Sequence, residues 1–177
     1  MQNPIIKNGV FSGLAMVIYT LVIYLVDPSL LSNMKLAFIP MIIVIIFMVR
    51  AVSDFKAQNN GFASFGEALL QSLGTAVIAT VISNIFVYIL YNFIDPGMLE
   101  VLKQASIDQM ESMEGLLGEE GVDRAVDELE SQEFTFGIGK VLIGTLTSIF
   151  IYLIISLIVA AITQKKPKGA ASLDSHV

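Results

Sequence analysis

The chain has 177 residues, of which 55% are hydrophobic and 15% charged, and its formal net charge at pH 7 is −6. It contains no cysteine and one histidine, His176, which excludes a disulfide framework, a zinc–thiolate cluster, an iron–sulfur site and a cysteine nucleophile. An acidic chain without a basic aromatic surface also argues against nucleic-acid binding. The length predicts one compact unit over residues 1–177.

Four uncharged apolar stretches dominate the chain: residues 9–26, 36–49, 68–94 and 141–164. A bilayer core about 30 Å thick needs roughly 20 apolar residues in a helix. Backbone groups in lipid must be paired internally, which helices of this length achieve. The sequence therefore predicts an all-α integral membrane bundle of four transmembrane helices, with borders accurate to about three residues.

The first span, residues 9–26, follows Lys7 and resembles a signal peptide at first sight. Its apolar run is longer than the roughly 7–15 residues of a signal core, and no cleavage site follows it. Pro28 instead biases Asp27 away from helical geometry and ends the helix. We expect an uncleaved membrane helix.

The second span has the shortest uncharged run, between Lys35 and Arg50, and contains Pro40. Both cationic side chains can extend their charged ends to the membrane interface, which makes residues 31–52 long enough to cross. The alternative is a re-entrant or interfacial segment.

The third span, residues 68–94, follows a capping box formed by Ser64 and Glu67 and ends before Asp95-Pro96-Gly97. A stripe of small and polar residues runs along it at four-residue steps: Ser72, Ala76, Thr80 and Asn84. Such a stripe favours close packing by another helix. The alternative is a polar lining for a solute pathway.

Two small-x-x-x-small patterns occur in other spans. Gly9 and Gly13 form one in the first span, and Gly144 and Ser148 form one in the last. Both predict close helix contacts, within the bundle or between protomers.

The loop of residues 95–140 holds 12 of the 16 acidic residues against three basic ones, a net charge of −9. Apolar residues recur in it at helical spacing: Leu99, Leu102, Met110, Met113 and Leu117. We expect an amphipathic helix broken at Gly118 and Gly121, followed by a shorter helix, resting on the membrane surface or on the bundle. The alternative is a disordered acidic linker. The tail, residues 165–177, is expected to be disordered.

The distribution of lysine and arginine predicts the orientation. Six of these residues fall on the side of the termini and the 50–67 link, and four on the other. The positive-inside rule therefore predicts that both termini are cytoplasmic and that the acidic loop faces outward.

Candidate polar residues near the membrane are few. No span has an ionisable residue at its centre, and no catalytic, phosphate-binding or calcium-binding motif occurs, so the sequence predicts no catalytic residue, cofactor or metal site. Arg50 and Glu67 lie at adjacent ends of the second and third spans, and we expect a direct or water-bridged structural contact between them. The alternative is a gate or a proton-handling pair. Asn84 is the most polar group near mid-span.

Two short motifs and the acidic loop resemble a known family. They are Phe62–Ala68, with the sequence FASFGEA, and Ile94-Asp95-Pro96. The chain is similar, over roughly residues 5–163, to the bacterial membrane proteins described as domain of unknown function 4199. The resemblance implies four helices and no known activity, and it singles out Glu67 as the family's most distinctive polar position.

Together these features predict a non-enzymatic, multi-pass protein of the bacterial inner membrane that acts through helix packing or its loop. Its expected partners are the lipid bilayer and a second copy or another membrane protein. A small oligomeric transporter or channel subunit is the alternative. It would need polar residues that face a lumen.

Overall fold

The computed structural model describes residues 3–131 and 136–165, and within these ranges the chain is helical with one isolated β-bridge. The elements are, in order, α1 (Pro4–Val26), the 3-10 helix η1 (Pro28–Ser32), α2 (Met34–Gln58), α3 (Phe65–Ile89), the π-helical turn η2 (Leu90–Ile94), α4 (Met98–Glu111), α5 (Glu114–Leu117), α6 (Glu119–Ser131) and α7 (Ile138–Thr163).

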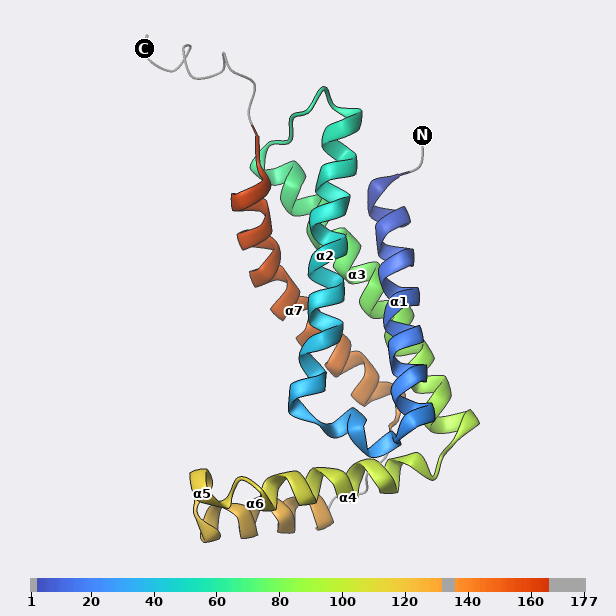
Figure 1. Cartoon of the computed structure of the whole chain (residues 1–177), viewed down its shortest axis with the longest axis vertical. Coiled ribbons are helices and arrows are strands. Elements are labelled where there is room, and N and C mark those ends of the chain that lie inside the picture. The colour runs from blue at the N-terminus through green and yellow to red at the C-terminus, as the bar shows by residue number, and fades with distance from the viewer. Residues whose placement is uncertain (1–2, 132–135, 166–177) are drawn as a thin grey trace.

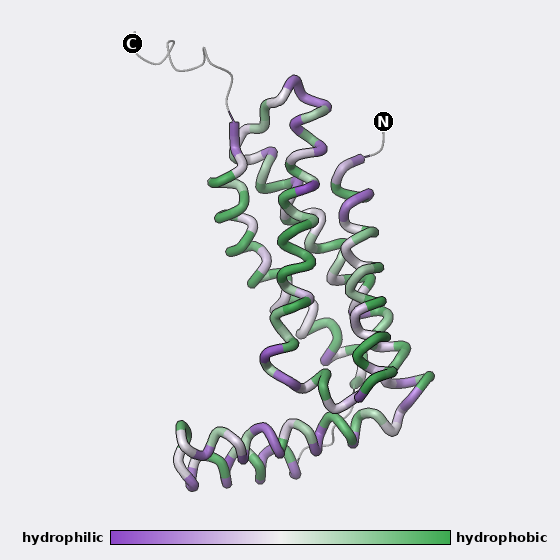
Figure 2. The backbone as a smooth tube through the Cα atoms, viewed as in Figure 1, coloured by the Kyte–Doolittle hydropathy of each residue, from purple (hydrophilic) through white to green (hydrophobic). Residues whose placement is uncertain are grey.

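Within the described residues, four helices are long and apolar enough to cross a membrane: α1, α2, α3 continued by η2, and α7. Figure 1 shows them as a bundle, and Figure 2 shows hydrophobic residues along its middle and hydrophilic ones at its ends. All four predicted membrane helices are therefore present, the second included. Two helices extend more than three residues past the predicted borders: α1 begins at Pro4, and α2 continues to Gln58.

Local side-chain caps decide where the helices begin. The side-chain oxygens of Asn3 and Asn33 accept hydrogen bonds of 3.0 Å from the backbone N–H groups of Ile5 and Lys35. The predicted capping box opens α3, because Ser64 and Glu67 bond to each other's backbone N–H. These caps satisfy amide groups that have no partner within the helix.

The closest packing is between α1 and the parallel helix α3. Cβ atoms built on Gly9 and Gly13 would lie 2.7 and 2.8 Å from the Cβ atoms of Ile78 and Ile82. Gly74 of α3 similarly faces Ile5, where a built Cβ would lie 2.9 Å from Cγ2. The glycine pattern of the first span thus makes the predicted close helix contact. Gly144 has no such neighbour within 4 Å and lies on the outside of α7.

The bundle has two distinct ends. At one, here called the link end, lie the start of α1, residues 59–64 and the end of α7 (Figure 1). There Ala63 and Lys165 exchange backbone hydrogen bonds of 3.0 and 2.7 Å, which tie α7 to the link. The predicted disorder of the tail concerns residues that, from 166 onward, lie outside the described part of the chain.

At the other end, α4, α5 and α6 form a helical hairpin that lies across the bundle and projects beyond it (Figure 1). The acidic loop is therefore helical from Met98 to Ser131, with short breaks. Gly118 breaks it as predicted, at a φ of +76° that favours glycine. Gly121 does not, because it lies inside α6.

Candidate functional site

At the link end, three polar side chains from α1 and α2 meet. Lys7 Nζ and Asn8 Nδ2 each donate a hydrogen bond of 3.0 Å to Oδ2 of Asp54. Asn8 also donates to the backbone oxygen of Pro4 at 3.0 Å, and it is only 1% exposed. The cluster joins the two helices through a buried amide that is bonded on both sides.

The predicted contact between Arg50 and Glu67 is not an ion pair, since none within 4.0 Å joins these two described residues. Oε2 of Glu67 accepts bonds of 2.8 Å from the backbone N–H and the hydroxyl of Ser64. Cζ of the Arg50 guanidinium lies 5.7 Å from the ring centroid of Phe47. The direct ion pair is absent, and the capping box engages the Glu67 carboxylate at its own helix start. The water-bridged form of the contact stays a prediction.

Asn84 lies at the boundary of α3 and α7 and donates a hydrogen bond of 2.6 Å to Oγ1 of Thr145. Thr145 in turn donates to the backbone oxygen of Val141 at 2.7 Å. The amide therefore links two membrane helices, which favours the packing interpretation of its stripe.

Replacing Asn84 with leucine is expected to lower the free energy of unfolding by about 0.5–1.5 kcal/mol, because hydrogen bonds between membrane helices contribute this much. Thr145→Val should lower the free energy of unfolding by a similar amount. The double variant should lower it by less than the sum of the two single effects. Unfolding measured in detergent micelles checks this. Additive effects of the two substitutions would contradict a direct bond.

The rest of the stripe is buried between helices. Ser72, Ala76 and Thr80 are all buried, and the Ser72 hydroxyl donates to the backbone oxygen of Ala68 at 2.9 Å. Four buried polar atoms within the described chain have no hydrogen-bond partner: Ser12 Oγ, Gln71 Oε1, Thr80 Oγ1 and Ser156 Oγ.

At the opposite end, the root of the hairpin is fixed to the bundle by side chains from several elements. The Tyr24 hydroxyl donates to Asp95 at 3.1 Å, and the Ser32 hydroxyl to the backbone oxygen of Leu102 at 3.4 Å. Asn92, in the π-helical turn, donates to the backbone oxygens of Tyr88 at 2.9 Å and Phe136 at 3.1 Å.

An apolar cluster of Leu90, Tyr91, Met98 and Leu102 reinforces this root. The ring of Tyr91 also meets that of Phe136 edge to face, with centroids 5.0 Å apart. Burial of these side chains and the hydrogen bonds together hold the first half of α4 against the bundle.

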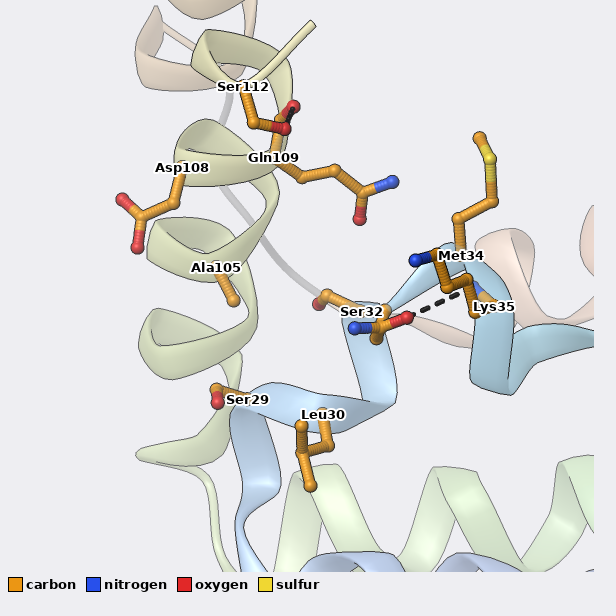
Figure 3. Close-up of a pocket in the computed structure, with 10 residues that line it drawn as sticks. Ser29, Leu30, Ser32, Met34, Lys35, Ala105, Asp108, Gln109 and Ser112 are labelled. Atoms are coloured by element: carbon orange, nitrogen blue, oxygen red, sulfur yellow. Dashed lines mark hydrogen bonds between the residues drawn. The ribbon is translucent and has the colours of Figure 1, made fainter.

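A cleft of about 460 Å³ opens between η1, the start of α2 and α4. Seven of the ten residues that line it have polar side chains, and the ten are Ser29, Leu30, Ser32, Asn33, Met34, Lys35, Ala105, Asp108, Gln109 and Ser112. Figure 3 shows Gln109 extending from α4 toward the turn that carries Met34 and Lys35, whereas Asp108 extends from the other side of α4. The cleft thus has hydrogen-bond donors on two walls.

Asp27 shapes the η1 wall of this cleft. Its Oδ1 accepts bonds of 2.7 and 2.9 Å from the hydroxyl and the backbone N–H of Ser29. The Ser29 hydroxyl and then its backbone N–H lower the pKa of the Asp27 carboxyl, and slight desolvation opposes them. The turn therefore keeps these bonds at neutral pH and loses their stabilisation as the pH falls through the lowered pKa.

Over residues 3–131 and 136–165, no group of three or more histidine, cysteine, aspartate or glutamate side chains is placed to hold a metal ion. The structure brings the predicted Glu67 to a helix cap, Arg50 to an aromatic ring and Asn84 to a helix interface.

Comparison with protein families gives one match. The model for a protein of unknown function, DUF4199, matches residues 7–165, nearly the whole chain. The chain belongs to the DUF4199 family. Searches of curated proteins and of solved structures found no match. With its four apolar helices, this member of DUF4199 is a multi-pass membrane protein of unknown biochemical activity.

Two features of this DUF4199 chain escaped the sequence reasoning. The Lys7–Asn8–Asp54 cluster could have been predicted from the sequence. Asn8 and Asp54 lie at similar distances along the chain from the α1–α2 turn, which places them at similar depth. The cleft could not have been predicted from the sequence. Its walls come from residues 29–35 and 105–112, and whether these segments approach each other depends on how the hairpin folds back.

Proposed function

We propose that this protein is non-enzymatic and acts through the hairpin α4–α6, which forms a rigid contact surface for another membrane protein. The observation that carries the proposal is the contrast between the two halves of the hairpin. Its root is fixed to the bundle by Tyr24, Ser32 and Asn92, whereas its far half projects beyond the bundle (Figure 1).

The far half fits a partner with a basic surface. Between Glu114 and Ser131 the chain carries seven acidic residues and one basic residue, Arg124, which pairs with Glu120. All seven acidic side chains are exposed: Glu114, Glu119, Glu120, Asp123, Asp127, Glu128 and Glu130. Leu116, at the tip, is 83% exposed. An acidic surface with an apolar tip is suited to steering and then anchoring a basic partner.

Photo-crosslinking in native membranes tests this proposal. A crosslinking amino acid at Asp123 should give one reproducible adduct, and the same group at Leu146 on the exposed face of α7 serves as the control. Replacing Asp127 and Glu130 with lysine should reduce the adduct at Asp123 about tenfold. An adduct that is absent, or that survives this charge reversal, contradicts a charge-guided contact.

A small oligomeric transporter or channel subunit is the second candidate. It is favoured by the four unpartnered polar atoms inside the bundle, on Ser12, Gln71, Thr80 and Ser156. Purified protein in liposomes should show no ion or solute flux above that of empty vesicles if the first proposal holds. Flux that disappears on replacing Gln71 with leucine would favour the second.

We further propose that the protein lies in a bacterial inner membrane with the link end in the cytoplasm. Lys7, Arg50, Lys56 and Lys165 lie toward that end, which fits the positive-inside rule. A reporter active only in the cytoplasm should be active when fused after residue 58 or 177 and silent after residue 115. The reverse pattern would invert the orientation.

A further inference from the structure

We propose that the cleft between η1 and α4 binds the head group of a zwitterionic phospholipid, with Lys35, Asn33 and Gln109 holding its phosphate. This lipid site is separate from the protein-contact surface on the far half of the hairpin. Three observations carry it: unpaired donors, an adjoining membrane-facing stripe, and the charge at the edge of the cleft.

The donors come from both walls and have no partner in the described part of the chain. The Lys35 ammonium forms no ion pair or hydrogen bond there, and neither does the Gln109 amide. Asn33 uses its oxygen to cap α2 at 3.0 Å, which leaves its NH₂ group for another acceptor. Figure 3 shows Lys35 and Gln109 on facing walls. An ammonium and two amides suit a phosphodiester, whose charge strengthens each hydrogen bond.

The adjoining stripe indicates that the phosphate belongs to a lipid. Met34 lines the cleft and begins a row of exposed apolar side chains at four-residue steps along α2. The row is Met34, Phe38, Ile42 and Ile46, exposed by 55%, 54%, 52% and 52%. It faces away from the bundle core on a membrane-spanning helix. An acyl chain along this row places its own head group in the cleft.

The charge of the surroundings selects among phospholipids. Asp108 is among the residues that line the cleft, but its side chain extends from the other side of α4 (Figure 3), where Oδ1 accepts a hydrogen bond of 2.9 Å from Nε2 of Gln104. The loop that contains it has a net charge of −9. A head group with a phosphate alone meets repulsion from these carboxylates. One that also carries an amine has no net charge and avoids this repulsion. The geometry therefore favours phosphatidylethanolamine-type chemistry over anionic lipids.

Native mass spectrometry of the full chain in detergent tests the site with four probes. These are a phosphatidylethanolamine, a phosphatidylglycerol, the matching diacylglycerol without phosphate, and inorganic phosphate as a competitor. The ethanolamine lipid should bind tightest, the diacylglycerol about tenfold more weakly, and inorganic phosphate should not compete. Equal binding of lipid and diacylglycerol, tighter binding of phosphatidylglycerol, or displacement by inorganic phosphate overturns the proposal.

Three substitutions locate the binding. Lys35→Met should weaken binding of the ethanolamine lipid about tenfold. Lys103→Met removes the same charge from α4 outside the cleft and should leave the binding affinity unchanged. Lys35→Arg should keep most of the affinity and shows that the position tolerates change. Asp108→Asn should reduce the preference for the ethanolamine lipid over phosphatidylglycerol. Equal losses for Lys35→Met and Lys103→Met would show that general charge, and not the cleft, governs binding.

Discussion

Replacing Gly9 with alanine is expected to lower the free energy of unfolding by about 2–3 kcal/mol, and replacing it with leucine should prevent the native packing of α1 on α3. An added Cβ would lie 2.7 Å from Cβ of Ile78 and 3.2 Å from the backbone oxygen of Thr75. Both atoms are fixed to the backbone of α3, so the helices themselves must separate. Close helix approach is what holds membrane helices together, because lipid supplies no hydrophobic force between them.

The measurement is thermal stability in detergent, read from the monodisperse fraction after heating. Gly144 provides a matched control, since it is also a glycine in a membrane helix but has no neighbour within 4 Å of a built Cβ. Gly144→Ala should change stability by less than about 0.5 kcal/mol. Equal losses at Gly9 and Gly144 would show that the cost comes from the glycine itself and not from the α1–α3 contact.

Replacing Asp54 with alanine is expected to cost about 2 kcal/mol of unfolding free energy. Most of this cost comes from Asn8, which is 1% exposed and would lose its acceptor on α2. The ion pair with Lys7 adds less, because the two side chains are 36% and 32% exposed and water screens their attraction. Asn8→Ala should remove most of the additional loss on Asp54→Ala, which gives a coupling of about 1–2 kcal/mol between the two sites.

The same unfolding measurement on Arg50→Ala and Glu67→Ala supplies the comparison. These residues share no ion pair, so their effects should add to within about 0.5 kcal/mol. Coupling between Arg50 and Glu67 as strong as that between Asn8 and Asp54 would contradict the arrangement at the link end. The cysteine-free chain accepts unique labelling sites for such measurements.

The sequence by itself determined the membrane helices, because an uncharged apolar run near bilayer length has few other structures available to it. It also determined local features that depend on neighbouring residues, such as the Ser64–Glu67 capping box and the break at Gly118. The contact of Gly9 and Gly13 followed from residue size, since only glycine permits so close an approach.

The tertiary structure decided which polar groups meet. The Glu67 carboxylate could bond either to Arg50 or to Ser64 at the start of its own helix. It bonds to Ser64, which is three residues away. Asp54 meets Asn8 only because the α1–α2 turn brings distant helix ends to one depth, and Lys35 shares a cleft with Gln109 only because the hairpin folds back across the bundle. Hydrophobic periodicity says which residues are apolar, but it does not encode these pairings, which depend on helix rotation and on the path of the turns.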